Sequence, residues 1–204
     1  MLTEHEETGW TADRYLAYQS ACRRASTSDV GLVPGLECNQ DGFHVLCYGL
    51  RELPRRPSTA TELAVAVHQQ GCILCLAHPG KYHWTIDAGL LGTVDAVEIW
   101  NSKWIYDGAL GPHPASVRLA AGKRVMVGQD VHKPKHLSSL FLDTQTDDVL
   151  ADLRNGQYAF AFGPRRWTPQ QLRCRTLTAT AQRCRTTLMR TALTGRRLLR
   201  QIAG

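Results

Sequence analysis

The 204-residue sequence lacks any run approaching the ~20 consecutive apolar residues that a membrane-spanning helix needs. The residues after Met1 are mostly polar and acidic, so the basic segment and apolar run of a secretory signal are missing as well. No internal repeat and no low-complexity stretch is present. These absences exclude a spanning segment and a repeat architecture, and the length predicts one good-sized domain, with or without an appendage.

The seven cysteines do not show the even, regular spacing of a disulfide framework. Cys72 and Cys75 have C-x-x-C spacing, but they lie in an apolar run that is typical of a buried strand. Thiols three residues apart on a strand point to opposite faces, which suits neither a metal nor a redox pair. We therefore expect core cysteines, a reducing compartment and a cytoplasmic location.

Lysine, aspartate and glutamate are absent from residues 165–204, which contain ten arginines. Subtracting these ten from 24 leaves 14 basic residues against 18 acidic ones in residues 1–164, a net charge of about −4. The chain is thus predicted to have a body over 1–164 and an Arg-rich, helical or partly disordered tail over 165–204. Three interpretations of the tail stay open: a solvated appendage, a contact for nucleic-acid phosphates, and a helix at an anionic lipid surface.

Apolar runs that favour strands alternate with amphipathic segments that favour helices. Unbroken apolar strands alternating with helices indicate a mainly parallel sheet covered by helices, as a layered α/β structure or a barrel. The expected strands cover residues 2–3, 32–37, 43–50, 72–77, 94–100, 124–127 and 158–162. The expected helices cover residues 11–25, 59–70, 114–121 and 147–155, and a further long helix begins near 168.

Metal-capable side chains follow the ends of these strands. The carboxyl ends of neighbouring parallel strands converge on one face, where such folds build active sites. His44 begins its strand, but a hairpin with the preceding strand would return it to the same end. Imidazole and carboxylate donors without thiolate match Zn²⁺, Mn²⁺ or Fe at hydrolytic sites. The candidate ligands are His5, Glu37, His44, His78, Asp130 and His132.

The motifs around these residues resemble those of the PHP (polymerase and histidinol phosphatase) domain family. T-E-H-E at residues 3–6 looks like its T-D-H-D motif, and P-G-L-E at 34–37 looks like its P-G-x-E motif. F-H-V-L at 43–46 is similar to the histidine-bearing strand that follows. A-H-P-G at 77–80, the D-x-x-E-x-x-N pattern at 95–101 and G-Q-D-V-H at 128–132 resemble three further motifs. The resemblance covers residues 2–162.

The resemblance implies a distorted (β/α)7 TIM-like barrel that binds up to three divalent metal ions and hydrolyses phosphate esters. The metal ligands carried over are the six residues named above, whereas Glu98 and Asn101 would shape the pocket. The expected substrate is a phosphorylated small molecule or a nucleotide. The motifs do not indicate which compound of this class it is.

The family's first motif, H-x-H on the first barrel strand, has no counterpart in this sequence. Two explanations stay open: a shortened reading frame, which we favour, and a degenerate domain with a partial site. Either predicts a barrel that is incomplete at the N-terminus and a weak or inactive phosphoesterase, so that whether this chain is an enzyme stays open. The alternative function is a non-catalytic accessory protein whose basic tail binds a polyanion.

Several other polar and aromatic residues flank the expected site. Trp100 and Trp104 could line a substrate pocket, although core packing is equally expected. Lys81, Tyr82 and His83 follow the A-H-P-G motif and could meet a phosphate. For that segment a solvated loop is slightly favoured.

Overall fold

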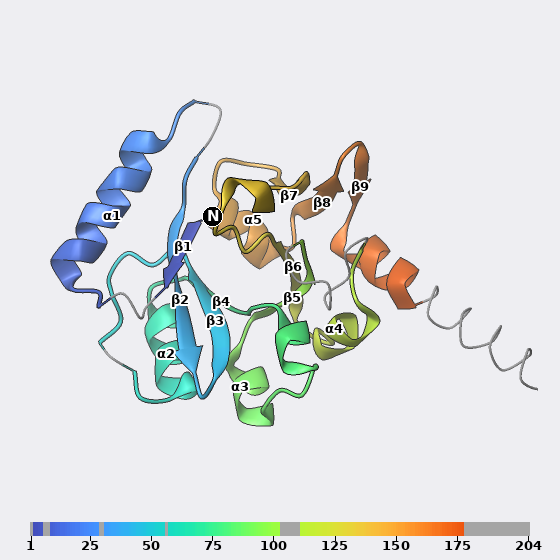
Figure 1. Cartoon of the computed structure of the whole chain (residues 1–204), viewed down its shortest axis with the longest axis horizontal. Helices are drawn as coiled ribbons and strands as arrows, with labels where there is room; N and C mark the ends of the chain where they lie inside the picture. The colour runs from blue at the N-terminus through green and yellow to red at the C-terminus, as the bar shows by residue number, and fades with distance from the viewer. Residues whose placement is uncertain (1, 6–8, 29–30, 56, 103–110, 178–204) are drawn as a thin grey trace, which may run out of the picture.

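The computed structural model describes residues 2–5, 9–28, 31–55, 57–102 and 111–177 (Figure 1). The prediction of a tail helix beyond residue 177 and the prediction for Trp104 lie outside these residues.

Six strands form the larger sheet, in the order in which they occur in the chain (Figure 1). Strand β3 is antiparallel to both of its neighbours, and every other adjacent pair is parallel. Five strands therefore end at the same edge of the sheet, and the β2–β3 hairpin confirms the predicted return of His44 to that edge. The strands are β1 (Leu2–His5), β2 (Pro34–Gln40), β3 (Phe43–Tyr48), β4 (Ile73–Leu76), β5 (Ala96–Asn101) and β6 (Arg124–Gly128).

A second, antiparallel sheet consists of β7 (Leu140–Thr144), β8 (Tyr158–Phe162) and β9 (Arg165–Trp167). The sequence pattern predicted β8 as the last strand, which is wrong because β9 pairs with it across a tight turn. Gly163 provides that turn with a φ of 56°. The β8–β9 hairpin crosses the predicted boundary at 164/165, so residues 165–167 pair with the body.

Helices begin where the sequence offers capping side chains. Thr11 and Thr59 each accept a hydrogen bond from the backbone N–H three residues on, and Gly156 ends α5 in the left-handed conformation. The α-helices are α1 (Ala12–Ala25), α2 (Ala60–Gln69), α3 (Ala88–Thr93), α4 (Pro114–Leu119), α5 (Val149–Asn155) and a helix over 169–177, and the 3₁₀ helices are η2 (Pro79–Tyr82) and η4 (Pro134–His136).

The core lies between the larger sheet and the helices packed on it. All four residues of β4 are buried, and α2 contacts this strand while α4 contacts β5. Cys72 and Cys75 are buried free thiols, as predicted. Trp100 is only 2% exposed, and its ring centroid lies 5.2 Å from that of Phe162, so this residue packs in the core.

The described residues thus show a mixed α/β structure with a parallel-rich sheet and helices. The barrel that the resemblance implies stays a prediction. Among the described residues, none of the helices has both the length and the apolar character to cross a membrane.

Gly49 follows β3 and packs against the Leu150 side chain of α5. Its φ is 82°, and a Cβ at this position would overlap the Leu150 side chain. Gly122 also has a positive φ, of 73°, but a Cβ there meets nothing within 4 Å. Both Gly→Ala substitutions carry the left-handed backbone cost of about 1–2 kcal/mol. We expect Gly49→Ala to lower the free energy of unfolding by a further ~1–3 kcal/mol through overpacking.

Urea denaturation of the two alanine variants measures this difference directly. Equal destabilisation of Gly49→Ala and Gly122→Ala would contradict the proposed packing of Leu150 on Gly49.

Candidate metal centre

The pairing of β1, β2 and β3 places three polar side chains on one face of the sheet. His5 and Glu37 are direct cross-strand partners, and Glu37 is in turn the partner of Leu46. His44 lies two residues before Leu46, so it shares that face and is a diagonal neighbour of Glu37. Strand β2 continues three residues beyond Glu37, which therefore does not close the strand as the sequence pattern predicted.

His78 follows β4 in an unusual backbone conformation. Its φ of 27° is rare for a residue other than glycine, and its N–H donates to Glu98 Oε2 at 2.8 Å. Strain of this kind costs about 1–3 kcal/mol and is concentrated at functional sites. The buried Glu98 carboxylate, which also accepts from Asn101 Nδ2 at 3.1 Å, fixes the backbone of His78.

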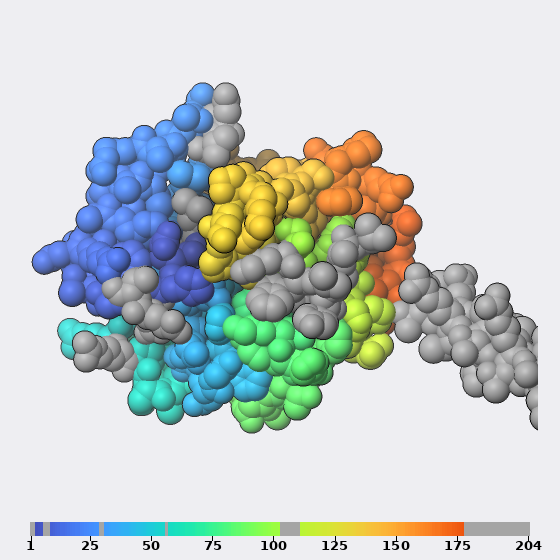
Figure 2. All heavy atoms as spheres, viewed as in Figure 1, coloured from blue at the N-terminus to red at the C-terminus, as the bar shows by residue number. Residues whose placement is uncertain are grey.

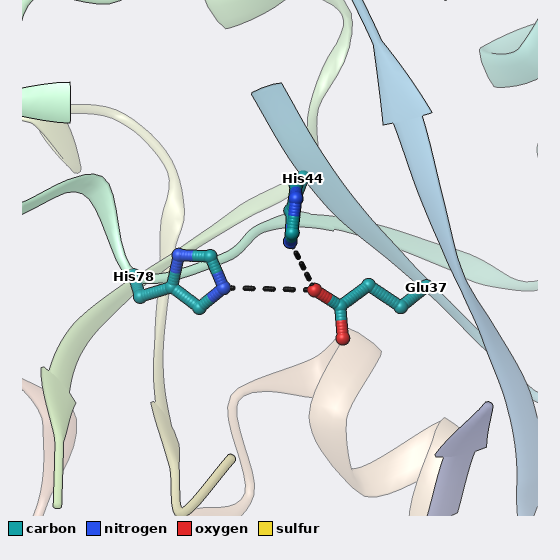
Figure 3. Close-up of side chains that lie close together, drawn as sticks. All are labelled: Glu37, His44 and His78. Atoms are coloured by element: carbon teal, nitrogen blue, oxygen red, sulfur yellow. Dashed lines mark hydrogen bonds and ion pairs between the residues drawn. The ribbon is translucent and has the colours of Figure 1, made fainter. Parts of the chain in front are cut away.

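Glu37, His44 and His78 form a compact group at the carboxyl edge of the sheet (Figure 3). Glu37 Oε1 contacts His44 Nδ1 and lies 3.6 Å from His78 Nε2. One ligand atom from each residue fits within 4.8 Å of the other two. The side chains are only 9%, 19% and 4% exposed, respectively, so the group is largely shielded from water.

Neighbouring side chains and burial set the pKa values of Glu37 and His78. Burial by itself would raise the pKa of Glu37, but hydrogen bonds from His44 and His78 hold it below its usual range. Burial would likewise lower the pKa of His78, but the hydrogen bond to Glu37 and the charge of Glu98 raise it above its usual value. Glu37 is therefore a carboxylate at neutral pH.

A second group adjoins the first. His5 Nε2 lies 3.2 Å from His132 Nε2, and His132 Nδ1 lies 3.1 Å from Asp130 Oδ1. His5 Nδ1 is 3.9 Å from Glu37 Oε2, so the two carboxylate oxygens of Glu37 face different groups. Figure 2 shows the N-terminal segment (dark blue) beside the segment that follows β6 (yellow). All six predicted ligand candidates thus form one continuous set of contacts.

Three neighbouring residues were not among the predicted ligands, although the sequence indicated that Lys81 and Tyr82 could meet a phosphate. Instead of a solvated loop, residues 79–82 form η2, in which Lys81 and Tyr82 are partly buried against His44. Lys81 Nζ lies 3.0 Å from His44 Nε2, and the Tyr82 hydroxyl accepts from His44 N at 2.8 Å. His136 Nδ1 accepts from the backbone N–H of His132 at 3.1 Å. In the sequence, the only signals for Lys81 were its positive charge and its position directly after the A-H-P-G motif.

The donor set fits a divalent metal ion. Two imidazole nitrogens and a carboxylate oxygen are ligands for Zn²⁺, Mn²⁺ or Fe, and a three-ligand protein site leaves a position for water or substrate. The depressed pKa of Glu37 keeps its carboxylate ionised, as a ligand must be. The arrangement can therefore hold a hydrolytic metal ion through Glu37, His44 and His78.

No protein-family model matches the sequence. A search of curated proteins also gives no significant match.

Glu98 is expected to support the strained His78 backbone. Glu98→Ala removes the acceptor for two buried donors, and each unsatisfied donor costs about 1–3 kcal/mol. We expect a loss of at least ~2 kcal/mol in the free energy of unfolding, measured by urea denaturation. The exposed Glu52 provides the control, because Glu52→Ala removes a carboxylate outside the core. A Glu98→Ala variant as stable as Glu52→Ala would contradict this role.

Proposed function

We propose that this protein is a metal-dependent phosphoesterase of the PHP type, with weak activity because its sequence has no counterpart of the family's first H-x-H motif. The observation that carries the proposal is the convergence of Glu37, His44 and His78 within 4.8 Å at the carboxyl edge of a parallel-rich sheet. Hydrolytic sites on such sheets use the same donors at the same edge. The resemblance of the motifs that bear these residues supports the same activity.

In the proposed site, Glu37, His44 and His78 hold one divalent ion, of Zn, Mn or Fe. His5, Asp130 and His132 would contribute to a neighbouring position, where His5 Nδ1 lies 3.9 Å from the second carboxylate oxygen of Glu37. The number of ions would then reach up to three in a complete site of this type. His5 and His132 are 40% and 42% exposed, so this side of the site is open to an approaching substrate.

A bound divalent ion supplies the electrophile that polarises phosphoryl oxygens and activates water. The chain's own residues orient the metal ligands and shield them from water. Glu98 fixes the His78 backbone, Tyr82 accepts from the His44 backbone, and burial of the three ligands lowers the local dielectric. The substrate class is a phosphorylated small molecule or a nucleotide.

The proposal extends to the fold, the cellular location and a binding partner of the protein. The consecutive order of β1 to β6 with parallel pairs supports the distorted (β/α)7 barrel. The six described cysteines are all free thiols, which supports a cytoplasmic location. The Arg-rich segment from residue 165 would provide a contact for a polyanion.

Metal binding tests the proposal first. We expect the purified protein to bind Mn²⁺ in isothermal titration calorimetry, and His44→Ala or His78→Ala to weaken binding by about 100-fold or more through loss of a ligand. His68 provides the matched control, because it pairs with Asp95 at 2.8 Å outside the site. His68→Ala should bind Mn²⁺ like the wild type.

A phosphoesterase assay of the same four proteins separates the two functions. Metal-dependent cleavage that is lost with His44 and His78 supports the enzyme. Metal binding without cleavage of any phosphoester favours the accessory protein, and wild-type protein that binds no metal rejects the metal centre.

The raised pKa of His78 predicts the pH dependence of metal binding. The metal needs the deprotonated imidazole, so protons compete with it once the pH falls to the pKa of His78. Because that pKa is raised, the Mn²⁺ affinity should begin to fall above about pH 6.5, which is the usual imidazole pKa. Below the pKa of His78, the affinity should fall by about tenfold per pH unit. Calorimetry from pH 8.5 to 5.5 measures the profile. An affinity that stays constant down to pH 6 would contradict the prediction.

A further inference from the structure

Lys81 is the cation nearest to His44 among the described contacts of the triad. Its ammonium lies 3.0 Å from His44 Nε2 and 5.6 Å from the centroid of the Tyr82 ring. The 3₁₀ helix η2 holds it there, because Tyr82 is bonded through its hydroxyl to the His44 backbone N–H. A positive charge therefore lies at the edge of the proposed metal centre.

The partners of His44 fix which of its ring nitrogens carries the proton. A lysine ammonium only donates hydrogen bonds, so His44 Nε2 must accept from Lys81. A carboxylate only accepts, so His44 Nδ1 must carry the proton that it donates to Glu37 Oε1. In the structure, Lys81 thus donates a hydrogen bond to His44, and His44 donates one to Glu37.

Metal binding at the triad would move the proton of His44 from Nδ1 to Nε2. Figure 3 shows that His44 Nδ1 and His78 Nε2 both point toward Glu37 Oε1, so Nδ1 is the His44 atom available to an ion held by all three. A neutral imidazole that uses Nδ1 as a ligand carries its proton on Nε2. Nε2 is then a donor facing the Lys81 ammonium, and the bond between them is lost.

We propose that Lys81 is a substrate-positioning residue that is released from His44 when the triad binds its metal ion and then binds a phosphoryl oxygen of the substrate. This inference rests on the proposed function and adds a second cationic contact for the phosphate beside the metal. The ammonium is already within one hydrogen bond of a ligand, so a short side-chain rotation brings it to an anion on the metal. A charge-assisted hydrogen bond of this kind strengthens phosphate binding about 10- to 100-fold.

Lys81→Met tests the proposal, because methionine keeps the unbranched apolar part of the side chain and removes the charge. We expect Lys81→Met loaded with Mn²⁺ to bind inorganic phosphate at least about tenfold more weakly than the wild type. In phosphate-free buffer the same variant should bind Mn²⁺ about three- to tenfold more tightly, since a competing cation and its hydrogen bond are gone. A merely structural role would weaken both affinities.

Two further variants separate charge from packing. Lys135→Met removes an exposed lysine near His132 and should leave the phosphate affinity within about twofold of the wild type, because screened exposed charges act weakly. Lys81→Arg retains the charge and should keep most of the phosphate affinity. Nitrogen NMR of the histidines provides an independent readout: His44 should be protonated on Nδ1 without metal and on Nε2 with Zn²⁺.

The outcomes distinguish the inference from the proposed function. Wild-type protein that binds no Mn²⁺ overturns the metal centre and the role of Lys81 with it. Metal binding with an unchanged phosphate affinity in Lys81→Met overturns the role of Lys81 alone. Weaker Mn²⁺ binding in Lys81→Met, loss of phosphate affinity in Lys81→Arg, or a His44 tautomer that does not change with Zn²⁺ overturns it as well.

Discussion

The contact of the Glu37 carboxylate with the imidazoles of His44 and His78 is the interaction on which the proposed chemistry depends. A largely buried carboxylate is costly unless it is paired, and the two imidazoles provide that pairing. The same three groups provide the nitrogen and oxygen donors that a divalent ion requires. Hydrogen bonds among Glu37, His44 and His78 therefore hold in place the donors that a divalent ion would need.

The fold explains why these residues meet. Glu37 and His44 come from adjacent strands of one hairpin, and His78 follows the next strand at the same edge. The backbone of His78 adopts a rare conformation, stabilised by Glu98 from β5. A bulge in β5 between Glu98 and Trp100 alters the register at this point, as bulges near functional sites do. The sheet thus supplies both the ligands and the residue that orients one of them.

Much of the site could be predicted from the sequence, because it depends on local pattern. Apolar runs predicted the strands of the larger sheet and β8, but not β7, and the polar residues near the strand ends predicted the six candidate ligands. The hairpin that returns His44 followed from the short turn before it. The lysine at position 81 was harder to interpret, since its bond to His44 joins residues 37 positions apart and depends on the 3₁₀ turn of η2. Strand β9 was missed because Arg165-Arg166-Trp167 has little apolar character, and only its pairing with β8 makes it a strand.

The central claim is that Glu37, His44 and His78 bind one divalent metal ion. The most direct measurement is a crystal structure of the Mn²⁺- or Zn²⁺-soaked protein with anomalous diffraction data. The account predicts an anomalous peak about 2.0–2.2 Å from Glu37 Oε1, His44 Nδ1 and His78 Nε2. A fully soaked crystal without a peak among these three atoms, or with the metal bound elsewhere, would contradict it.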